Sequence, residues 1–300
     1  MPPKTESEMA ERRTRYLEAV PEDRDNQVAK LLQTYSHIPA DQVTPHLHAI
    51  RDRAWAVFPY TCIGSWRFLD LYFTKLPVYA SVVERLRDGG DRLLDAGCCF
   101  GYMLRQLAAD GAPTANLVGS DLEQLFIDLG FDLFRDRDTF KGTFVAADML
   151  EDDEAGAGQK ELAALDGTLD MVHAASFFHM FSWEDQVRLG ERVVRFFRPA
   201  DKTKATNSGR PRLLFGRQVG NIAPVDRATL AARGEYRFHH NPATLQQLWD
   251  EIGERTKTKW RVEAELVPEA RPEKRQPATD GAKKKEDHYM IRFAIYQEEY

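Results

Sequence analysis

The chain has 300 residues, of which 43% are hydrophobic and 29% are charged, a composition typical of a folded globular protein rather than a disordered one. Its formal net charge is −6, so it offers no general electrostatic attraction to nucleic acid or to an anionic membrane surface. We therefore expect a small-molecule partner, with neither nucleic acid nor a membrane as a partner.

The cysteines are Cys62, Cys98 and Cys99. Two of them are adjacent, which provides neither a disulfide framework nor zinc-ligand spacing, so we predict no metal site. No apolar run approaches the roughly 18 residues of a membrane span. The first residues, MPPKTESE, lack the apolar stretch of a signal peptide, and a cytoplasmic location is the expectation.

The first 88 residues are predicted to form a charged arm followed by a helical lid. Residues 1 to about 28 are dense in Glu, Arg and Lys, residues 28–32 and 46–58 carry helical spacing, and residues 58–68 are aromatic and broken by turns. An aromatic lid can exclude water and enclose an apolar substrate. Tyr60 and Trp66 are therefore candidate substrate-binding residues, with packing of the lid on the core as the alternative for each.

The stretch RLLDAGCCFGYML at residues 92–104 predicts a strand, a tight loop and the start of a helix. Gly97 and Gly101 permit positive φ angles and a close approach of backbone N–H groups to a ligand. Asp95 precedes the first glycine by two residues, where a carboxylate would repel phosphate but could help to hold a cationic ligand. This spacing differs from the G-x-G-x-x-G of dinucleotide sites and disfavours a nicotinamide-dependent reductase.

The elements that follow alternate between strands and helices, and the first strands end in acids. Asp121 ends the second strand, 20 residues beyond Gly101, the offset at which an acid can hold a ribose. Asp148 follows the third strand. Strands are predicted at 91–95, 116–120, 143–147, 168–174, 212–219, 259–267 and 288–297, and helices at 76–87, 101–110, 122–134 and 186–197. Ser182, with an acid three residues on, is predicted to cap the last of these helices, and residues 220–240 are predicted to form a long loop. Residues 269–287, rich in Pro, Lys and Glu, are predicted to form a mobile loop.

Three side chains on or after the fourth and fifth strands are candidates for the reaction centre, because ligands of such sheets bind beyond the carboxyl ends of the strands. His179, in the loop after the fourth strand, could transfer a proton or orient an acceptor oxygen, with a local backbone contact as the alternative. Arg217 could bind a substrate carboxylate or form a surface salt bridge. His240 could border the substrate pocket, and Asn241 with Pro242 should begin a helix.

The sequence DAGCCFG at residues 95–101 resembles motif I of the class I S-adenosylmethionine-dependent methyltransferases, with Cys99 in place of the middle glycine. The resemblance implies an α/β fold: a Rossmann-like, seven-stranded, mostly parallel sheet with helices on both faces, an antiparallel last strand and an N-terminal helical lid. Residues 89–300 would form the cofactor-binding domain. Its S-adenosylmethionine contacts would be Asp95, Gly97, Cys98, Gly101, Asp121, Leu122, Asp148, Met149 and, as a cofactor neighbour, His173.

Segments at 95–101, 119–122, 133–138, 173–179 and 214–220 look like the fungal methyltransferases of meroterpenoid and related polyketide pathways. Several members of that group make methyl esters, which implies an O-methyltransferase acting on a secondary metabolite. A carboxylate acceptor is favoured because it is ionised near neutral pH, whereas a phenol usually needs a base. Phenol methylation, a rearrangement or cyclisation that uses the cofactor only structurally, and a regulatory binding role are the alternatives. A homodimer is left open.

Overall fold

The computed structural model describes residues 14–22, 26–151, 153, 156–199, 210–268 and 289–298. The loop predicted at 269–287 and most of the predicted N-terminal arm lie outside these residues. The chain divides into two compact units, the first made of residues 1–148 and 153–163 and the second of residues 149–152 and 164–300. The boundary that the sequence places after residue 88 stays a prediction.

The described residues of the first unit form three parallel strands with helices packed against them. Strand β2 pairs with β1 on one side and with β3 on the other, and the register sets Asp95 opposite Gly119 and Asp121 opposite Ala146. The carboxyl ends of the three strands therefore meet at one edge, as the sequence predicts. The elements are β1 (Leu93–Ala96), α6 (Tyr102–Ala109), η3 (Thr114–Asn116), β2 (Leu117–Asp121), α7 (Gln124–Phe134), β3 (Thr143–Ala146) and α8 (Ala157–Ala163).

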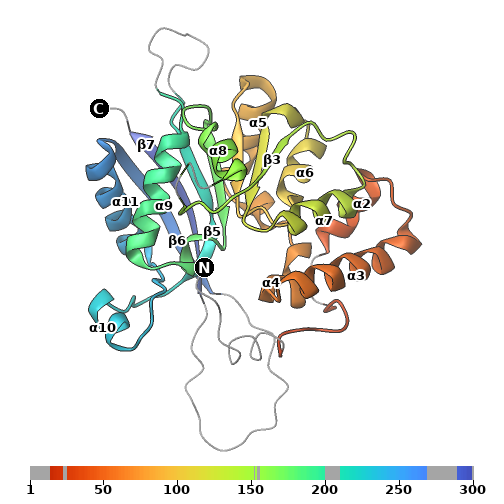
Figure 1. Ribbon diagram of the computed structural model, residues 1–300, viewed down its shortest axis with the longest axis horizontal. Coiled ribbons are helices and arrows are strands. Elements are labelled where there is room, and N and C mark those ends of the chain that lie inside the picture. The colour runs from red at the N-terminus through yellow and green to blue at the C-terminus, as the bar shows by residue number, and fades with distance from the viewer. Residues whose placement is uncertain are drawn as a thin grey trace, which may run out of the picture. The chain divides into compact units, whose positions relative to one another are not determined.

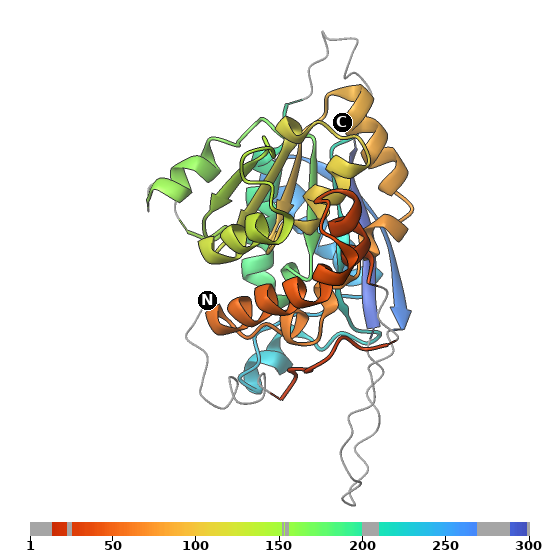
Figure 2. The ribbon, with the colours of Figure 1, turned by 90° about the vertical axis from the view of Figure 1, so that its right-hand side faces the viewer.

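The N-terminal part of this unit is helical, as predicted. Helix α3, the long orange helix in Figure 2, packs against α7. Its buried residues Val43, Leu47, Ile50 and Ala54 follow the three-to-four-residue spacing of one helix face. The elements are α2 (Gln27–Thr34), α3 (Ala40–Val57), α4 (Thr61–Gly64), η1 (Arg67–Leu69), η2 (Tyr72–Lys75) and α5 (Tyr79–Gly89).

Among its described residues the second unit contains four strands, and the last of them in the chain runs antiparallel to its neighbours. Strand β4 is parallel to β5, and β7 is antiparallel to both β5 and β6. Helices α9 and α11 pack against each other in this unit (Figure 1). The elements are β4 (Met171–Ala175), η4 (Phe178–Met180), α9 (Trp183–Phe196), β5 (Leu213–Gly220), α10 (Arg227–Ala232), α11 (Pro242–Thr256), β6 (Lys259–Pro268) and β7 (Tyr289–Glu298).

The strand order is β3-β2-β1-β4-β5-β7-β6, which confirms the predicted seven-stranded, mostly parallel sheet with an antiparallel last strand. The predicted helix starts are also confirmed: the side chains of Ser182 and Asn241 cap α9 and α11. The loop predicted at 220–240 is only partly a loop because it contains α10, a helix of six residues that is too short for a periodic signal. Within the described ranges, no helix has both the length and the apolar character needed to cross a bilayer.

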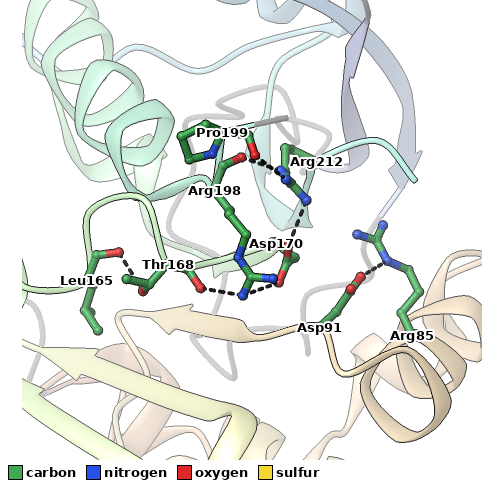
Figure 3. A network of polar contacts seen from close by, with 8 residues as sticks. All are labelled: Arg85, Asp91, Leu165, Thr168, Asp170, Arg198, Pro199 and Arg212. Atoms are coloured by element: carbon green, nitrogen blue, oxygen red, sulfur yellow. Dashed lines mark hydrogen bonds and ion pairs between the residues drawn. The ribbon is translucent and has the colours of Figure 1, made fainter. Parts of the chain in front are cut away.

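A buried carboxylate joins the starts of β4 and β5. Asp170 is fully buried, and its Oδ1 accepts a hydrogen bond of 2.7 Å from Arg212, while Arg198 lies 3.3 Å from Oδ2 (Figure 3). Arg212 also donates to the carbonyl oxygen of Arg198. In the first unit, Arg85 and Asp91 form a separate buried pair at 2.7 Å. A buried carboxylate is tolerated only where such partners replace water, so the cluster around Asp170 fixes where the two strands begin.

We predict that Asp170→Asn lowers the free energy of unfolding by about 3–5 kcal/mol, because it leaves buried guanidinium charge without its counter-ion. Asp128→Asn is the matched control, since Asp128 pairs with Arg137 at 3.0 Å on the surface, where such a pair contributes about 1 kcal/mol or less. Urea unfolding followed by circular dichroism measures both. Equal losses in the two variants would contradict the role assigned to Asp170.

Candidate functional site

The glycine loop closes onto the neighbouring strand through backbone hydrogen bonds. The N–H groups of Gly97 and Cys98 both donate to the carbonyl oxygen of Ser120, at 2.8 and 3.0 Å, and Gly101 N–H donates to Cys98 O at 2.8 Å. Gly97 and Gly101 have φ angles of 73° and 61°, a region that favours glycine. The two glycines of the sequence motif are thus the residues that turn the chain from β1 into α6.

Cys99 takes the place of a glycine in conformation as well as in sequence. Its φ angle is 50°, and its N–H donates to Asp121 Oδ2 at 2.8 Å, across 22 residues of chain. The other carboxylate oxygen of Asp121 accepts the N–H of Glu123 at 3.1 Å. One carboxylate therefore holds the glycine loop after β1 and the turn after β2 together, a function that the sequence did not indicate for Cys99.

Asp121 retains capacity for a ligand. An ionised carboxylate offers about four acceptor positions, and the two backbone N–H groups use two of them. Burial raises the pKa of this carboxyl to about 6, although its two hydrogen bonds act in the opposite direction. Leu122, the next residue, is 44% exposed. An acceptor of hydroxyl hydrogens beside an exposed apolar side chain fits a ribose with its attached base.

The two other acidic cofactor candidates, Asp95 and Asp148, lie at the carboxyl ends of strands in the first unit. Asp95 lies in β1 and is 4% exposed. Asp148 follows β3, and its carbonyl oxygen accepts a hydrogen bond of 2.7 Å from the side chain of Gln159, a contact that sequence analysis missed. Met149 is 6% exposed and belongs to the second unit. The three predicted acids thus stand at or just beyond the ends of three successive strands.

Tyr60 lies on the cofactor side of the first unit. Its ring centroid is 5.8 Å from that of Phe126 on α7 and 4.4 Å from that of Phe58. Burial raises the pKa of its phenol, and the nearby Asp121 carboxylate raises that pKa further. Tyr60 therefore lies near Asp121, the acid predicted to bind the cofactor. Its contact with the substrate stays a prediction.

Trp66, the other aromatic candidate, is a core residue of the helical region. It is fully buried, its indole N–H donates to Leu17 O at 3.0 Å, and the guanidinium of Arg51 stacks on its ring at 4.0 Å. This is the packing alternative that the sequence left open. Contact between Trp66 and a substrate would require this cluster to open.

In the second unit, β5 holds the loop that carries His179. The backbone N–H of His179 donates to Gln218 Oε1 at 3.2 Å. Arg217, the neighbour of Gln218, lies opposite Ala175 in the sheet, and its carbonyl oxygen accepts the N–H of Ser176 at 2.7 Å. The two predicted residues, His179 and Arg217, therefore belong to two segments tied together at the ends of β4 and β5.

The other two histidine candidates are buried in this unit. His173 is 2% exposed, and its ring centroid is 5.1 Å from that of Phe215. His240 is fully buried, with Nε2 3.1 Å from Gln186 Oε1 and Nδ1 3.2 Å from Thr244 Oγ1. Burial lowers the pKa of His240 to about 3, so its imidazole is neutral near pH 7. These contacts support a bracing role, and contact of His240 with an acceptor stays a prediction.

A search of the described part of the chain finds no group of three His, Cys, Asp or Glu residues arranged to hold a metal ion.

The fold and the glycine loop define the class of protein. A seven-stranded mostly parallel sheet with a reversed last strand, and a glycine loop joined to the acid that ends β2, are the features of a class I S-adenosylmethionine-dependent methyltransferase. Comparison with protein families agrees. Residues 15–69 match the meroterpenoid methyltransferase N-terminal domain, and residues 93–200 match a methyltransferase domain.

Relatives from fungi define the family. The O-methyltransferase atr3 of Stereocaulon alpinum is 41% identical over 89% of this chain and 73% of its own length. The methyltransferase adrK of Penicillium rubens is 39% identical, over 78% of each chain. The Asnovolin E/Chermesin D methyltransferase nvfJ of Aspergillus novofumigatus is 35% identical, over 80% of this chain and 81% of its own. The chain belongs to this family of fungal meroterpenoid-pathway methyltransferases, and its cofactor is S-adenosylmethionine.

We predict that Gly101→Ala destabilises the protein more than Gly90→Ala. Both glycines have φ angles above 60°, so either alanine is strained by about 1–2 kcal/mol. At Gly90 a Cβ atom meets nothing within 4 Å, whereas at Gly101 it would lie 2.5 Å from Arg105 Nη1 and 3.0 Å from the Phe144 ring. Arg105 cannot easily move, because it is buried and bidentate to Asp136.

Urea unfolding of the two glycine variants, together with calorimetric titration of S-adenosylhomocysteine, tests this prediction. Gly101→Ala should lose at least about 1 kcal/mol more than Gly90→Ala and should bind the product more weakly. Equal losses, with unchanged binding, would show that the loop tolerates a side chain at Gly101.

We also predict that cofactor affinity falls as the pH is lowered through about 6, the pKa of Asp121. A carboxylate that accepts ribose hydroxyls must be ionised, so below this pKa binding must first release a proton, at a cost of up to tenfold in affinity per pH unit. The free energy of unfolding depends on pH in the opposite sense, because a raised carboxyl pKa means that ionisation of the group opposes folding. This group therefore stabilises the ligand-free protein as the pH falls from above 6 towards the ordinary Asp pKa.

Calorimetric titration of S-adenosylhomocysteine between about pH 5 and about pH 7.5 measures this dependence. Asp121→Asn removes the ionisable group, so its affinity should be low and nearly flat over the same range. A wild-type affinity that does not change across this range would refute the assignment of Asp121 as the ribose acid.

Proposed function

We propose that this methyltransferase transfers a methyl group to an oxygen of a small secondary metabolite and forms a methyl ester on a carboxylate. The observation that carries the proposal is the charge of the segments at the ends of β4 and β5. Residues 171–181 and 213–220 contain His179, Arg217 and Gln218 but no Asp or Glu. Hydrogen-bond donors without neighbouring acids in these segments suit an anionic acceptor.

On the cofactor side, we assign ribose binding to Asp121 and placement of the loop backbone to Gly97 and Gly101. The exposed side chain of Leu122 supplies an apolar surface for the base. Asp95 and Asp148 provide negative charge at the ends of β1 and β3 for a cationic nucleoside. Cys98, Met149 and His173 are assigned as neighbours of the cofactor. When bound, S-adenosylmethionine supplies the electrophilic methyl group.

On the acceptor side, we assign His179 to orient the acceptor oxygen and Arg217 to bind the acceptor carboxylate. A carboxylate is ionised near neutral pH, so the protein need not remove a proton before the oxygen attacks. Its contribution is then alignment of the oxygen and exclusion of water. His179 would act as a base only if the acceptor were a phenol.

We propose further that residues 1–88 form an arm and a lid that limit access of water, with Tyr60 at the edge of the cofactor site. Residues 89–300 form the catalytic domain in this division, and the expected setting is the cytoplasm. The acceptor is proposed to be a small molecule, with no nucleic acid or membrane as substrate.

The test is incubation of the purified protein with methyl-labelled S-adenosylmethionine and a panel of polyketide and terpenoid acids, followed by mass spectrometry. The expected result is an acid that gains one labelled methyl group and loses it again on mild alkaline hydrolysis, because esters hydrolyse and ethers do not. Asp121→Asn should lower the rate at saturating acid and limiting cofactor. Asp128→Asn, a change of the same kind on the surface of α7, should not.

Two outcomes would contradict the ester assignment. A methyl group that survives alkaline hydrolysis, as that of a phenol ether does, would rule out a methyl ester. Conversion of a substrate without any transfer of label would identify a reaction in which the cofactor is not the methyl donor.

A further inference from the structure

Gln218 is a buried side chain of β5 with one end bound and the other end available. It is 1% exposed, and its Oε1 accepts the backbone N–H of His179 at 3.2 Å. Its Nε2 is also buried, and within the described residues it has no hydrogen-bond partner. A buried amide nitrogen without a partner is costly, and such a group in a native protein calls for an explanation.

The orientation of this amide is fixed by chemistry. If oxygen and nitrogen were exchanged, Nε2 would face the N–H of His179, which would bring two donors together. The oxygen must therefore be the atom that binds His179. The two N–H bonds of Nε2 are the donors that remain.

A second buried glutamine in the same unit shows what complete satisfaction looks like. The Nε2 of Gln186 donates to Phe181 O at 3.2 Å and to Phe238 O at 3.0 Å, and its Oε1 contacts His240 Nε2 at 3.1 Å. All the polar atoms of Gln186 are thus used to hold the fold together. The side chain of Gln218 is also buried but makes one such contact, through its Oε1.

We propose that Gln218 is a substrate-binding residue whose Nε2 donates to the carboxylate of the acceptor. The inference rests on the proposed function, because it concerns the acceptor of the same reaction. It also gives Gln218 a second task, since the same amide holds the backbone of His179. Binding of the acceptor and placement of His179 are then coupled through one side chain.

The chemistry identifies which oxygen of the acceptor Gln218 would hold. A hydrogen bond to the attacking oxygen would stabilise its charge and reduce its nucleophilicity. A hydrogen bond to the other oxygen fixes the orientation of the carboxylate and leaves the first oxygen able to attack the methyl carbon. One C–O bond then forms, the S–C bond breaks with its electron pair going to sulfur, and no proton has to move.

The variant Gln218→Glu separates the two tasks. Its carboxyl group can still accept the N–H of His179, but once ionised it has no donor and repels an anionic acceptor. Gln246→Glu is the matched control, because Gln246 Oε1 also accepts a backbone N–H, that of Val262 at 2.9 Å, while its Nε2 already donates to Trp260 O and Asp250 Oδ1. Because Gln218 is buried and Gln246 is only half-buried, circular dichroism must show that Q218E is folded before the two variants are compared.

The first measurement does not depend on turnover. In the nitrogen-15 spectrum of the protein saturated with S-adenosylhomocysteine, the side-chain amide signals of Gln218 are identified by their loss in Q218E. Titration with sodium benzoate, a simple aromatic carboxylate, should move these signals, and those of Gln246 should stay in place. Unmoved Gln218 signals up to the solubility limit of benzoate would overturn the proposal.

The second measurement uses an acid that the wild-type enzyme methylates. Q218E should raise KM for that acid about tenfold or more, the effect expected for loss of a hydrogen bond to a charged group. The increase should grow with pH as the introduced carboxyl group ionises, while the affinity for S-adenosylhomocysteine stays as in wild type. Q246E should leave KM unchanged. A KM for Q218E within twofold of wild type at every pH would overturn the proposal.

These results separate the two hypotheses. If the wild-type enzyme makes an ether rather than an ester, the proposed function fails, and the benzoate titration still decides whether Gln218 binds a carboxylate. If the enzyme makes an ester and Q218E has the wild-type KM, the proposed function stands and the role of Gln218 is refuted.

Discussion

The arrangement of the predicted cofactor site depends on the hydrogen bonds of the Asp121 carboxylate. This carboxylate accepts the N–H of Cys99 in the glycine loop and the N–H of Glu123 in the turn before α7. A carboxylate that fixes two backbone segments cannot rotate freely, so its remaining lone pairs point in fixed directions. The side chain that would bind the ribose is also the one that builds the loop, and this explains why an acid stands at the end of β2.

The charges along the strands follow the chemistry of methyl transfer. Acids stand at or after the ends of β1, β2 and β3, where the family places a cofactor that carries positive charge. The segments after β4 and within β5 instead offer His179, Arg217 and Gln218. Under the proposed reaction, this distribution favours a sulfonium cofactor near the first three strands and an anionic acceptor near β4 and β5.

Buried polar groups in the second unit have two roles: some hold the fold together, and Gln218 is proposed to bind a ligand as well. Asp170 with its arginines, and Gln186 with His240, have their partners within the protein, and their task is to position strands and loops. Gln218 accepts the backbone N–H of His179, and its buried Nε2 has no hydrogen-bond partner among the described residues. The contrast indicates that the fold can satisfy a buried amide where it needs to. The buried Nε2 of Gln218 is therefore the donor for which we propose a ligand partner.

Local sequence patterns predict the order of the elements, the glycine loop, the strand-end acids and the caps of α9 and α11, because each of these is encoded within a few neighbouring residues. Which side chains are buried and which can meet a ligand depends on the packing of distant segments. Trp66 and His240 are fully buried, bound to partners 49 and 54 residues away. Cys99 reaches Asp121 over 22 residues, and His179 reaches Gln218 over 39. Local pattern carries no information on such distant partners, since a hydrogen bond between them forms only when packing brings their segments together.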